Sequence, residues 1–371
     1  MKIALLHDYN EEIGGAEVYY RSLVKLLEER GHKVLSLCGD SYSTPSIRYV
    51  LSTYNPVYRL RFVPRIRAFH PDVVHVHSMW HNISPSFLAQ TSRIGLPILH
   101  TPHEVIDLPR IDLRRPRSCF SPLKKRTLMW FIREYVDLVL PPARFLANKL
   151  RREYGLQSIL PLPLFVGLSR PQNFRVSSEG KHFVTYVGRL ADGKGLIDLV
   201  AAILSVAAAL PDVELRIVGD GPIKAELQRV IRTLGLDGRV ILYGRIPHTE
   251  VDRFYEESDL VVLPSTIPEV FPLSIVEAMS HALPVVTTSI GGQAELVISG
   301  INGITVPPGN REALAAAILR LLQDPDLAMQ YGRNARKRVE AFYSPEVHAM
   351  RIEKAYEAAL ERPAVRSSRS T

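Results

Sequence analysis

The sequence has little cysteine and no long uninterrupted apolar run. Its 371 residues include two cysteines, too few for a disulfide framework or a four-cysteine zinc site, and such sparse use fits a reducing cytoplasm. The longest apolar stretch, from Leu196 to Leu210, is interrupted by Asp198 and is too short to cross a bilayer. The apolar run at the start of the chain is far too short for a signal peptide. We therefore expect a cytoplasmic protein, soluble or peripheral to a membrane.

Charge is unevenly distributed along a chain of otherwise ordinary composition. Hydrophobic residues make up 46% of the chain and charged residues 23%, which is typical of a globular protein and excludes a disordered one. The formal net charge is +8, but residues 1–180 hold 25 Lys and Arg against 15 Asp and Glu, whereas residues 181–371 hold 21 against 23. The first half is therefore suited to an anionic partner, or is simply a solvated basic surface.

Short apolar segments alternate with helical patterns in two successive series. This rhythm predicts parallel sheets covered by helices, and the length favours two domains. We therefore predict an α/β protein with two Rossmann-like units facing across a cleft that holds the ligand, joined by a proline-rich connection at 155–180. The predicted strands are 3–7, 33–37, 73–77, 97–101 and 137–140, then 182–188, 213–219, 239–243, 259–263, 284–287 and 303–306; two helices, near 325–342 and 345–361, end the fold.

A glycine-rich turn with two basic residues follows the first predicted strand of the second series. In residues 188–195 (GRLADGKG), backbone amides at a helix start can face an anion beside two fixed cations, Arg189 and Lys194. These features predict a diphosphate site. The spacing G-x-x-x-x-G-K also fits a P-loop, but Gly195 stands where that motif needs Ser or Thr to hold Mg²⁺. A surface turn with solvated charges is the third interpretation.

Two glutamates flank the start of a predicted helix at 273–282. Glu269 precedes this helix and Glu277 lies in its second turn, so the two carboxylates can hold different hydroxyl groups. Ser274-x-x-Glu277 is also a capping-box pattern, in which Glu277 would bond only to backbone. Paired acids can also suggest glycoside hydrolysis, but no second feature supports a hydrolase and the diphosphate turn argues against one.

Two other glycine pairs follow predicted strands. Gly219-Asp220-Gly221-Pro222 ends one strand and begins a helix, with Pro222 at the first helical position, and its glycines would let the backbone approach a ligand closely. It lacks the third glycine of a dinucleotide motif, and without context a tight strand–helix turn explains it. Gly14-Gly15 opens the first helix, where amides can face a phosphate or an acceptor.

Histidines gather in the first half of the chain. His75 and His77 point to one face of a predicted strand, and imidazole is a common zinc ligand. No Cys or carboxylate stands at a supporting spacing, so we predict no metal site. His103 directly follows a predicted strand, at the edge where α/β proteins bind ligands. The group comprises His70, His75, His77, His81, His100 and His103.

Taken together, these segments resemble the retaining GT-B glycosyltransferases of family 4, the glycosyl transferases of group 1. The resemblance covers nearly the whole chain and implies a donor-binding domain at 166–344, an acceptor-binding domain at 1–165, a helix at 345–361 that returns to the first domain, and a tail at 362–371. The matching motifs, in the family's order and spacing, are Gly188-Arg189-Leu190 with Lys194-Gly195, Gly219-x-Gly221-Pro222, Glu269-x7-Glu277-Ala278-Met279, Pro284-Val285-Val286 and Gly291-Gly292.

The resemblance also implies a role for each matching residue. Arg189 and Lys194 would hold the donor diphosphate and stabilise it as it leaves. Glu277 would take ribose hydroxyls, Glu269 would contact the transferred sugar, and His103 would lie near the reaction centre. The implied catalytic residues are His103, Arg189, Lys194 and Glu269, and the implied donor-binding residues are Gly14, Gly15, Gly188, Gly221, Pro222, Arg245, Ile246, Phe271, Pro272, Leu273, Ser274 and Glu277.

Two positions depart from the family pattern. Pro272 stands where the family commonly has Gly, which removes one backbone amide that could contact the donor. Ala282 replaces another usual Gly. Neither change removes a charged group, so both bear on sugar preference rather than on the reaction.

The sequence thus predicts a retaining hexosyltransferase that moves a sugar from a UDP- or GDP-linked donor to a hydroxyl acceptor, such as a lipid-linked or polysaccharide precursor. No cofactor or metal is expected, because two cations can replace Mg²⁺ at the diphosphate. The alternatives are a P-loop phosphotransferase and a sugar-nucleotide-binding protein without catalysis. No segment resembles a base-reading module, so nucleic acid is not expected as a partner.

Two basic segments of the first half suggest a membrane surface. Arginines alternate with apolar residues over 59–67, and seven basic residues fall within 110–126, followed by Trp130 and Phe131. Basic residues near an anionic membrane contribute roughly 1 kcal/mol each, and apolar neighbours can insert at the headgroup level. We therefore predict peripheral binding to the cytoplasmic leaflet, with a solvated basic surface as the alternative.

Overall fold

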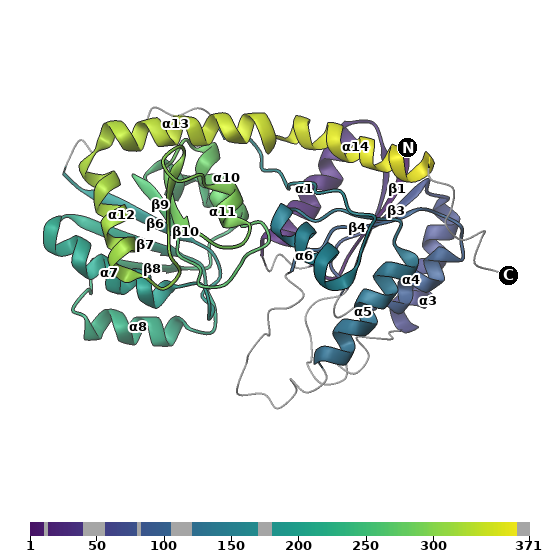
Figure 1. Ribbon diagram of the computed structural model, residues 1–371, viewed down its shortest axis with the longest axis horizontal. Coiled ribbons are helices and arrows are strands. Elements are labelled where there is room, and N and C mark those ends of the chain that lie inside the picture. Colours follow the sequence, from purple (N-terminus) through teal and green to yellow (C-terminus); the bar gives the residue numbers. More distant parts are fainter. Residues whose placement is uncertain (11–13, 40–55, 80–82, 105–120, 170–179, 362–371) are drawn as a thin grey trace. The chain divides into compact units, whose positions relative to one another are not determined.

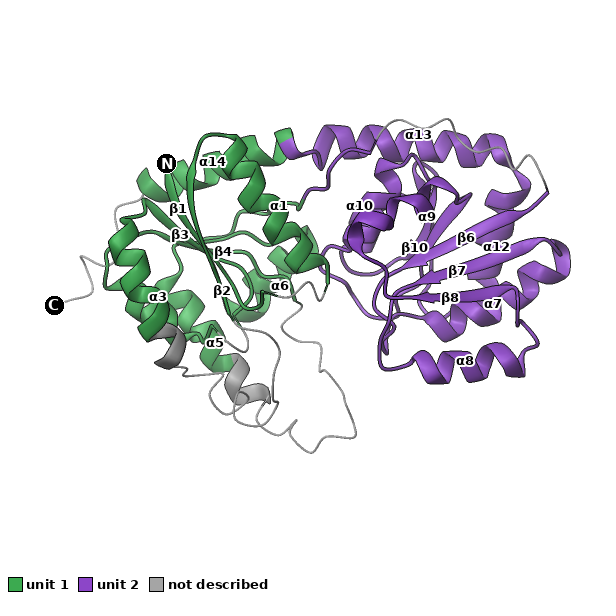
Figure 2. Cartoon of the chain, turned by 180° about the vertical axis from the view of Figure 1, so that it is seen from behind, with its two compact units in different colours: residues 1–164, 346–371 green, residues 165–345 purple. Residues whose placement is uncertain are grey.

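The computed structural model describes residues 1–10, 14–39, 56–79, 83–104, 121–169 and 180–361 (Figure 1). Side chains are described from residue 60 in the range that begins at 56, and from residue 126 in the range that begins at 121. The chain forms two compact units, unit 1 from 1–164 with 346–371 and unit 2 from 165–345 (Figure 2). The boundaries lie within one residue of those expected, at the end of the first domain and before the final helix.

Unit 1 is built on a parallel sheet in the order β2-β1-β3-β4-β5. Its strands match the five predicted from the apolar runs; β1, β3, β4 and β5 are buried through most of their length, whereas only Leu37 of β2 is buried. Helices surround the sheet, as Figure 2 shows. The elements are β1 (Lys2–His7), α1 (Gly15–Glu29), β2 (Lys33–Cys38), α3 (Pro56–Phe69), β3 (Val73–Val76), α4 (Ser86–Ser92), β4 (Ile98–His100), α5 (Ser121–Tyr135), β5 (Leu138–Val139) and α6 (Arg144–Tyr154).

The final helix, α14 (Pro345–Glu361), packs on unit 1. Tyr356 is fully buried there and its hydroxyl lies 3.0 Å from Nδ1 of His75 on β3. At the surface, Glu353 pairs with Arg30 at 2.9 Å. This placement agrees with the expected return of the last helix to the first domain.

Unit 2 repeats the architecture with a parallel sheet in the order β11-β10-β9-β6-β7-β8. The six strands again coincide with those predicted from the sequence. The elements are β6 (His182–Val187), α7 (Leu196–Ala209), β7 (Val213–Val218), α8 (Lys224–Thr233), β8 (Val240–Gly244), η2 (His248–Glu250), α9 (Asp252–Glu256), β9 (Leu260–Leu263), α10 (Leu273–Ser280), β10 (Val285–Thr288), α11 (Gln293–Leu296), β11 (Gly303–Val306), α12 (Arg311–Gln323) and α13 (Pro325–Phe342).

Four neighbouring strands of unit 2 carry the predicted donor motifs at their carboxyl ends. Because β10, β9, β6 and β7 are adjacent and parallel, the loops that follow them meet at one edge of the sheet. Apolar runs at these strands bury both faces, which is typical of parallel sheets. Within the described ranges, no helix is both long and apolar enough to span a membrane.

Candidate active site

The loop after β6 packs directly against the loops after β7 and β9. The Leu190 amide donates to the Asp220 carbonyl at 3.0 Å, and the Thr266 amide donates to the Gly193 carbonyl at 2.8 Å. The basic turn predicted from residues 188–195 is therefore held between two other loops at the sheet edge. A solvated, unsupported surface turn does not describe it.

The glycines of these loops bring backbone segments together. A Cβ at Gly219 would lie 1.9 Å from the Gly188 carbonyl oxygen, and one at Gly221 would lie 2.2 Å from the Leu190 carbonyl oxygen. Both distances are far below van der Waals contact, so only glycine fits either position. The sequence left two interpretations of Gly219 and Gly221, close approach to a ligand and a tight strand–helix turn; the structure shows that both glycines let one loop approach the next.

Lys194 and Glu269 form an ion pair between the loops after β6 and β9. Their Nζ and Oε2 atoms are 2.6 Å apart, and the side chains are only 22% and 14% exposed. The Ser265 hydroxyl donates to the other carboxylate oxygen. Two residues separated by 75 positions are thus joined, and the Glu269 carboxylate has a partner on each oxygen.

The backbone of Glu269 is fixed from the loop after β10. Its amide donates to Oε1 of Gln293 at 3.0 Å, and its carbonyl accepts from the Gly292 amide at 2.7 Å. Gln293 is fully buried, and its own amide group bonds to Thr288 at 3.2 Å. Sequence reasoning missed Ser265 and Gln293, because neither belongs to a charged motif.

Glu277 does not form the capping box that its spacing from Ser274 allows. Helix α10 begins at Leu273 with Pro272 as its N-cap, and no side chain caps it, so Ser274 already lies inside the helix. The Glu277 carboxylate instead accepts from the Tyr255 hydroxyl at 2.9 Å and lies 3.0 Å from Nε2 of His248. The capping interpretation is therefore wrong, and this carboxylate faces side chains rather than backbone.

The prediction that Pro222 occupies the first position of a helix is also wrong. Helix α8 begins at Lys224 with Ile223 as its N-cap, so Pro222 precedes the helix instead of occupying its first position. The Ile223 amide is bonded to the Leu190 carbonyl at 3.2 Å, which keeps these residues in a turn against the loop after β6. Pro222 itself is exposed at the sheet edge.

The remaining predicted donor residues of unit 2 lie on the same set of loops. Arg189 is exposed just after β6, and Arg245 and Ile246 follow β8, with Arg245 exposed. Arg245 acts on Asp220 electrostatically: the pKa of Asp220 lies below its usual range, mainly because its carboxylate accepts from the Gly221 amide and pairs with Lys224, with a smaller effect of Arg245. Phe271 is half-buried, with its ring centroid 5.6 Å from that of Tyr343.

A histidine cluster, buried except for the half-buried His103, occupies the sheet edge of unit 1. Nδ1 of His77 lies 3.1 Å from Nε2 of His103, and the two rings are stacked. His75 is held between the Thr101 hydroxyl at 2.9 Å and Tyr356. Burial and the neighbouring imidazoles lower the pKa of both His77 and His103, so the pair is neutral near pH 7.

The cluster accounts for most of the predicted histidine group. His100 is buried and its Nδ1 bonds to the Val76 carbonyl at 2.9 Å, whereas His70 is exposed and His81 lies outside the described residues. A cavity of about 20 Å³, the size for one water molecule, is lined by His77, His100 and His103 together with Glu104. In the described part of the chain, no group of three or more His, Cys, Asp or Glu side chains is placed to hold a metal ion.

The glycine pair of unit 1 begins a helix as predicted. Gly14 is the N-cap of α1 and Gly15 is its first residue. The Gly14 amide donates to Oε2 of Glu17 at 2.8 Å, and Oε1 of that carboxylate lies 3.2 Å from Nε2 of the fully buried His7. Sequence reasoning did not identify His7 or Glu17, because their contact depends on how α1 packs on β1.

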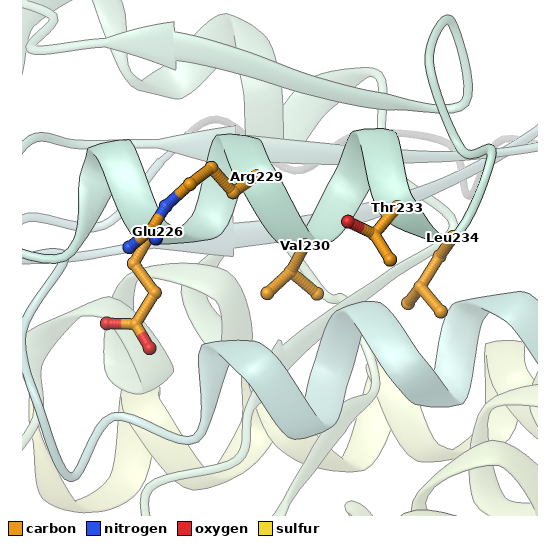
Figure 3. Close-up of a pocket in the computed structure, with 5 residues that line it drawn as sticks. All are labelled: Glu226, Arg229, Val230, Thr233 and Leu234. Atoms are coloured by element: carbon orange, nitrogen blue, oxygen red, sulfur yellow. The ribbon is translucent and has the colours of Figure 1, made fainter.

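A larger cavity, of about 260 Å³, lies elsewhere on unit 2. Figure 3 shows its lining residues along one side of α8 and its C-terminal end. No predicted site residue contributes to its lining. The lining residues are Glu226, Arg229, Val230, Thr233 and Leu234.

Two family models match the chain and together account for most of it. The model described as Glycosyltransferase Family 4 matches residues 13–168, and that described as Glycosyl transferases group 1 matches residues 170–338. The second match contains the basic turn at 188–195, Glu269 and Glu277. The chain is a family 4, group 1 glycosyltransferase.

Similar proteins agree with this assignment. The glycosyltransferase is 34% identical over 170 residues to alpha-D-kanosaminyltransferase of Streptomyces kanamyceticus, covering 46% of this chain and 44% of that protein, which is less than half of the relative's length. Among solved structures, sucrose-phosphate synthase of Thermosynechococcus elongatus has a TM-score of 0.80 at 24% identity, covering 96% of this chain and 98% of that one. HepE of Anabaena, solved in complex with UDP-glucose, has a TM-score of 0.74 at 21% identity, covering 96% and 100%. These structural likenesses establish the GT-B fold.

Proposed function

We propose that this glycosyltransferase moves a sugar from a nucleotide-diphosphate sugar to a hydroxyl acceptor, with retention of configuration and without a metal ion. The observation that carries the proposal is the Lys194–Glu269 pair, which lies where the loops after β6 and β9 meet. A cation for the diphosphate and a carboxylate for sugar hydroxyls thus stand side by side. That HepE was solved with UDP-glucose supports a UDP-linked donor.

In this mechanism, the bond between the anomeric carbon and the diphosphate oxygen breaks while the acceptor oxygen bonds to the same carbon on the same face. Arg189 and Lys194 stabilise the negative charge that develops on the leaving diphosphate. The acceptor's proton passes to a phosphate oxygen of the donor. Glu269 orients the sugar, Glu277 accepts from the ribose hydroxyls, and neutral His103 supplies a hydrogen bond at the reaction centre.

The geometry of Gly195 argues against the P-loop phosphotransferase. Its φ is +69°, a conformation that favours glycine, and a Cβ there would lie 2.0 Å from the Pro264 carbonyl oxygen. A Ser or Thr side chain, which a P-loop needs to hold Mg²⁺, cannot be placed at this position without moving the backbone.

The proposal is tested by binding and product analysis with a panel of UDP- and GDP-linked sugars, each assayed with and without EDTA. We expect one donor to be consumed and the product to keep the donor's anomeric configuration, with the rate unchanged by EDTA. A loss of activity that Mg²⁺ restores would overturn the metal-independent mechanism. Binding without transfer to any acceptor tested would favour the sugar-nucleotide-binding protein that lacks catalysis.

The Glu277→Gln variant separates donor binding from a structural role. We expect about tenfold weaker nucleotide binding, the size of one charge-assisted hydrogen bond, with little change in melting temperature, because glutamine still accepts from Tyr255. Glu269→Gln, by contrast, should lower kcat. Titration calorimetry, thermal melts and initial rates measure these effects; equal, purely thermal effects in both variants would contradict the site.

The membrane proposal retains part of the surface predicted from the sequence. On α3, Phe62 and Ile66 are fully buried in unit 1 and cannot insert into lipid, whereas Leu60 is 68% exposed, beside exposed Arg61 and Arg65. On α5, Trp130 is 44% exposed, next to exposed Arg126 and Arg133. The arginines at 110, 114, 115 and 117 lie outside the described residues.

We expect the protein to co-sediment with vesicles that contain anionic lipid at low salt and to be released at high salt, because each basic residue near the surface contributes roughly 1 kcal/mol. Replacing the arginines of 110–117 with Gln should weaken this binding. Neutral vesicles and an Arg320→Gln variant, on α12 of unit 2, are the controls. Absent binding to anionic vesicles, or binding unchanged in the 110–117 variant, would favour a soluble acceptor.

A further inference from the structure

Tyr255 presents its hydroxyl to Glu277 from a neighbouring element. It lies on α9, its side chain is 1% exposed, and its Oη is 2.9 Å from Oε2 of Glu277 and 3.4 Å from the Ser274 carbonyl oxygen. A phenol has one proton to donate. Of the two oxygens, the Glu277 carboxylate oxygen is nearer and charged, so it is the stronger acceptor. Burial, and then the charge of Glu277, raise the pKa of Tyr255, so it remains a donor throughout the physiological range.

His248 holds the other oxygen of the same carboxylate. It lies on the short helix η2, between β8 and α9, and its Nε2 is 3.0 Å from Oε1 of Glu277. Its side chain is 45% exposed, whereas that of Glu277 is 16% exposed. Donors from two separate elements therefore fix the carboxylate plane, which a single partner would leave free to rotate.

Each carboxylate oxygen can accept more than one hydrogen bond. With one donor on each oxygen, Glu277 retains acceptor capacity on both, at a side chain that is still partly open to solvent. Two neighbouring acceptor oxygens on a fixed plane suit two adjacent hydroxyl groups, as in a vicinal diol. This is the arrangement of the 2′ and 3′ hydroxyls of a ribose.

We propose that Tyr255 and His248 are positioning residues that hold the Glu277 carboxylate for the ribose diol of the nucleotide. The inference rests on the proposed function, since it requires that Glu277 bind the nucleotide ribose. A purely structural role for Tyr255 would be packing, because its ring also lies against His281, with centroids 5.3 Å apart. Phenylalanine would preserve that packing and remove only the hydroxyl.

The test measures the affinity of UDP and of 2′,3′-dideoxy-UDP by titration calorimetry. We expect Tyr255→Phe to weaken UDP binding about five- to tenfold, the loss of one hydrogen bond to a charged group, and to change dideoxy-UDP binding less than twofold. His248→Ala should act in the same direction, and His248→Gln, which restores an N–H donor, should recover part of the loss. The donor KM should rise in step while kcat changes little.

Tyr331→Phe on α13, also a buried tyrosine of unit 2, is the matched control and should leave both affinities unchanged. Equal weakening of UDP and dideoxy-UDP by Tyr255→Phe, or no weakening of either, would overturn the inference while leaving the proposed function intact. If the wild-type protein binds GDP and not UDP, the same series is run with GDP and its dideoxy analogue. Wild-type protein that binds neither nucleotide would overturn the proposed function and this inference with it.

Discussion

Replacing Lys194 with alanine is expected to slow sugar transfer by about 30- to 1000-fold, which corresponds to roughly 2–4 kcal/mol of transition-state stabilisation. The ammonium group of Lys194 lies at the junction of the loops after β6 and β9. In the proposed mechanism, the donor diphosphate binds there and gains negative charge as it leaves. Because the side chains of Lys194 and Glu269 are largely shielded from water, the charge lost with Lys194 is poorly replaced by solvent. Initial rates at saturating donor measure the effect.

Lys194 also neutralises Glu269, so its removal leaves a half-buried carboxylate held by Ser265 alone. Lys194→Arg, which keeps the charge, should recover part of the rate, and thermal melts of both variants show whether folding changes. Arg189→Ala is a cleaner probe of the same diphosphate, because this side chain is exposed and its removal leaves no buried group unpaired.

Arg320→Ala on α12 is the matched control for Arg189, since it removes an exposed arginine of the same unit that belongs to no predicted motif. We expect the control to keep wild-type turnover. Folded Lys194→Ala or Arg189→Ala protein with near wild-type turnover would show that the donor diphosphate binds elsewhere.

Unit 1 is expected to lose stability steeply as the pH falls below about 6.5. Burial lowers the pKa of His75 to about 3, and that of His100 and of His348 to about 4. An unfolded histidine titrates near 6.5, so between 6.5 and 4 the unfolded chain binds protons that the folded unit does not. The free energy of unfolding therefore rises with pH across this window and is lost as the pH falls through it.

Each histidine that stays neutral contributes a slope of up to about 1.4 kcal/mol per pH unit below 6.5. Three such groups would remove roughly 6 kcal/mol between pH 7 and pH 5, as an upper bound, which is comparable to the whole stability of many domains. The Glu353 carboxyl affects stability at lower pH. Its hydrogen bond with Arg30 lowers its pKa, so its contribution to the free energy of unfolding is lost only as the pH falls below about 4.5.

Urea unfolding followed by tryptophan fluorescence at several pH values measures this loss. Both tryptophans, Trp80 and Trp130, belong to unit 1, so the signal reports that unit. Nε2 of His348 lies 3.0 Å from the Tyr19 hydroxyl. His348→Gln, whose amide can still bond to that hydroxyl, should reduce the difference in bound protons between the unfolded and folded states by about one. A free energy of unfolding that stays constant from pH 7 to pH 5 would contradict the neutral, buried cluster.

The order of strands and helices was accessible from the sequence because it depends on local patterns. Apolar runs such as those at 73–77 and 260–263 are buried on both faces of a parallel sheet, and glycines mark the turns after them. The motif residues were found for the same reason: Arg189, Lys194 and Glu269 lie in loops that follow strands, and Glu277 lies in the second turn of the next helix. The family model that matches 170–338 contains them all.

The pairing of those residues was decided by the tertiary structure. Spacing allowed Glu277 to cap its own helix, but packing of α9 and η2 brings Tyr255 and His248 to its carboxylate. Likewise, Lys194 meets Glu269 and Gln293 holds that residue's backbone because β6, β9 and β10 are neighbours in the sheet. Contacts between residues far apart in sequence depend on strand order, which no local pattern specifies.

The same reason explains the glycines and the histidines. Gly219 and Gly221 look like ligand-facing glycines in sequence, yet their lack of a Cβ lets the loops after β6 and β7 touch. His75 lies on β3 and His77 directly follows it, but their neutral, buried state arises from α14, α1 and β4, whose residues come from both ends of unit 1. The sequence by itself determined the elements and the chemistry at their ends; the tertiary structure decided which side chains meet there, because burial and partners are properties of packing.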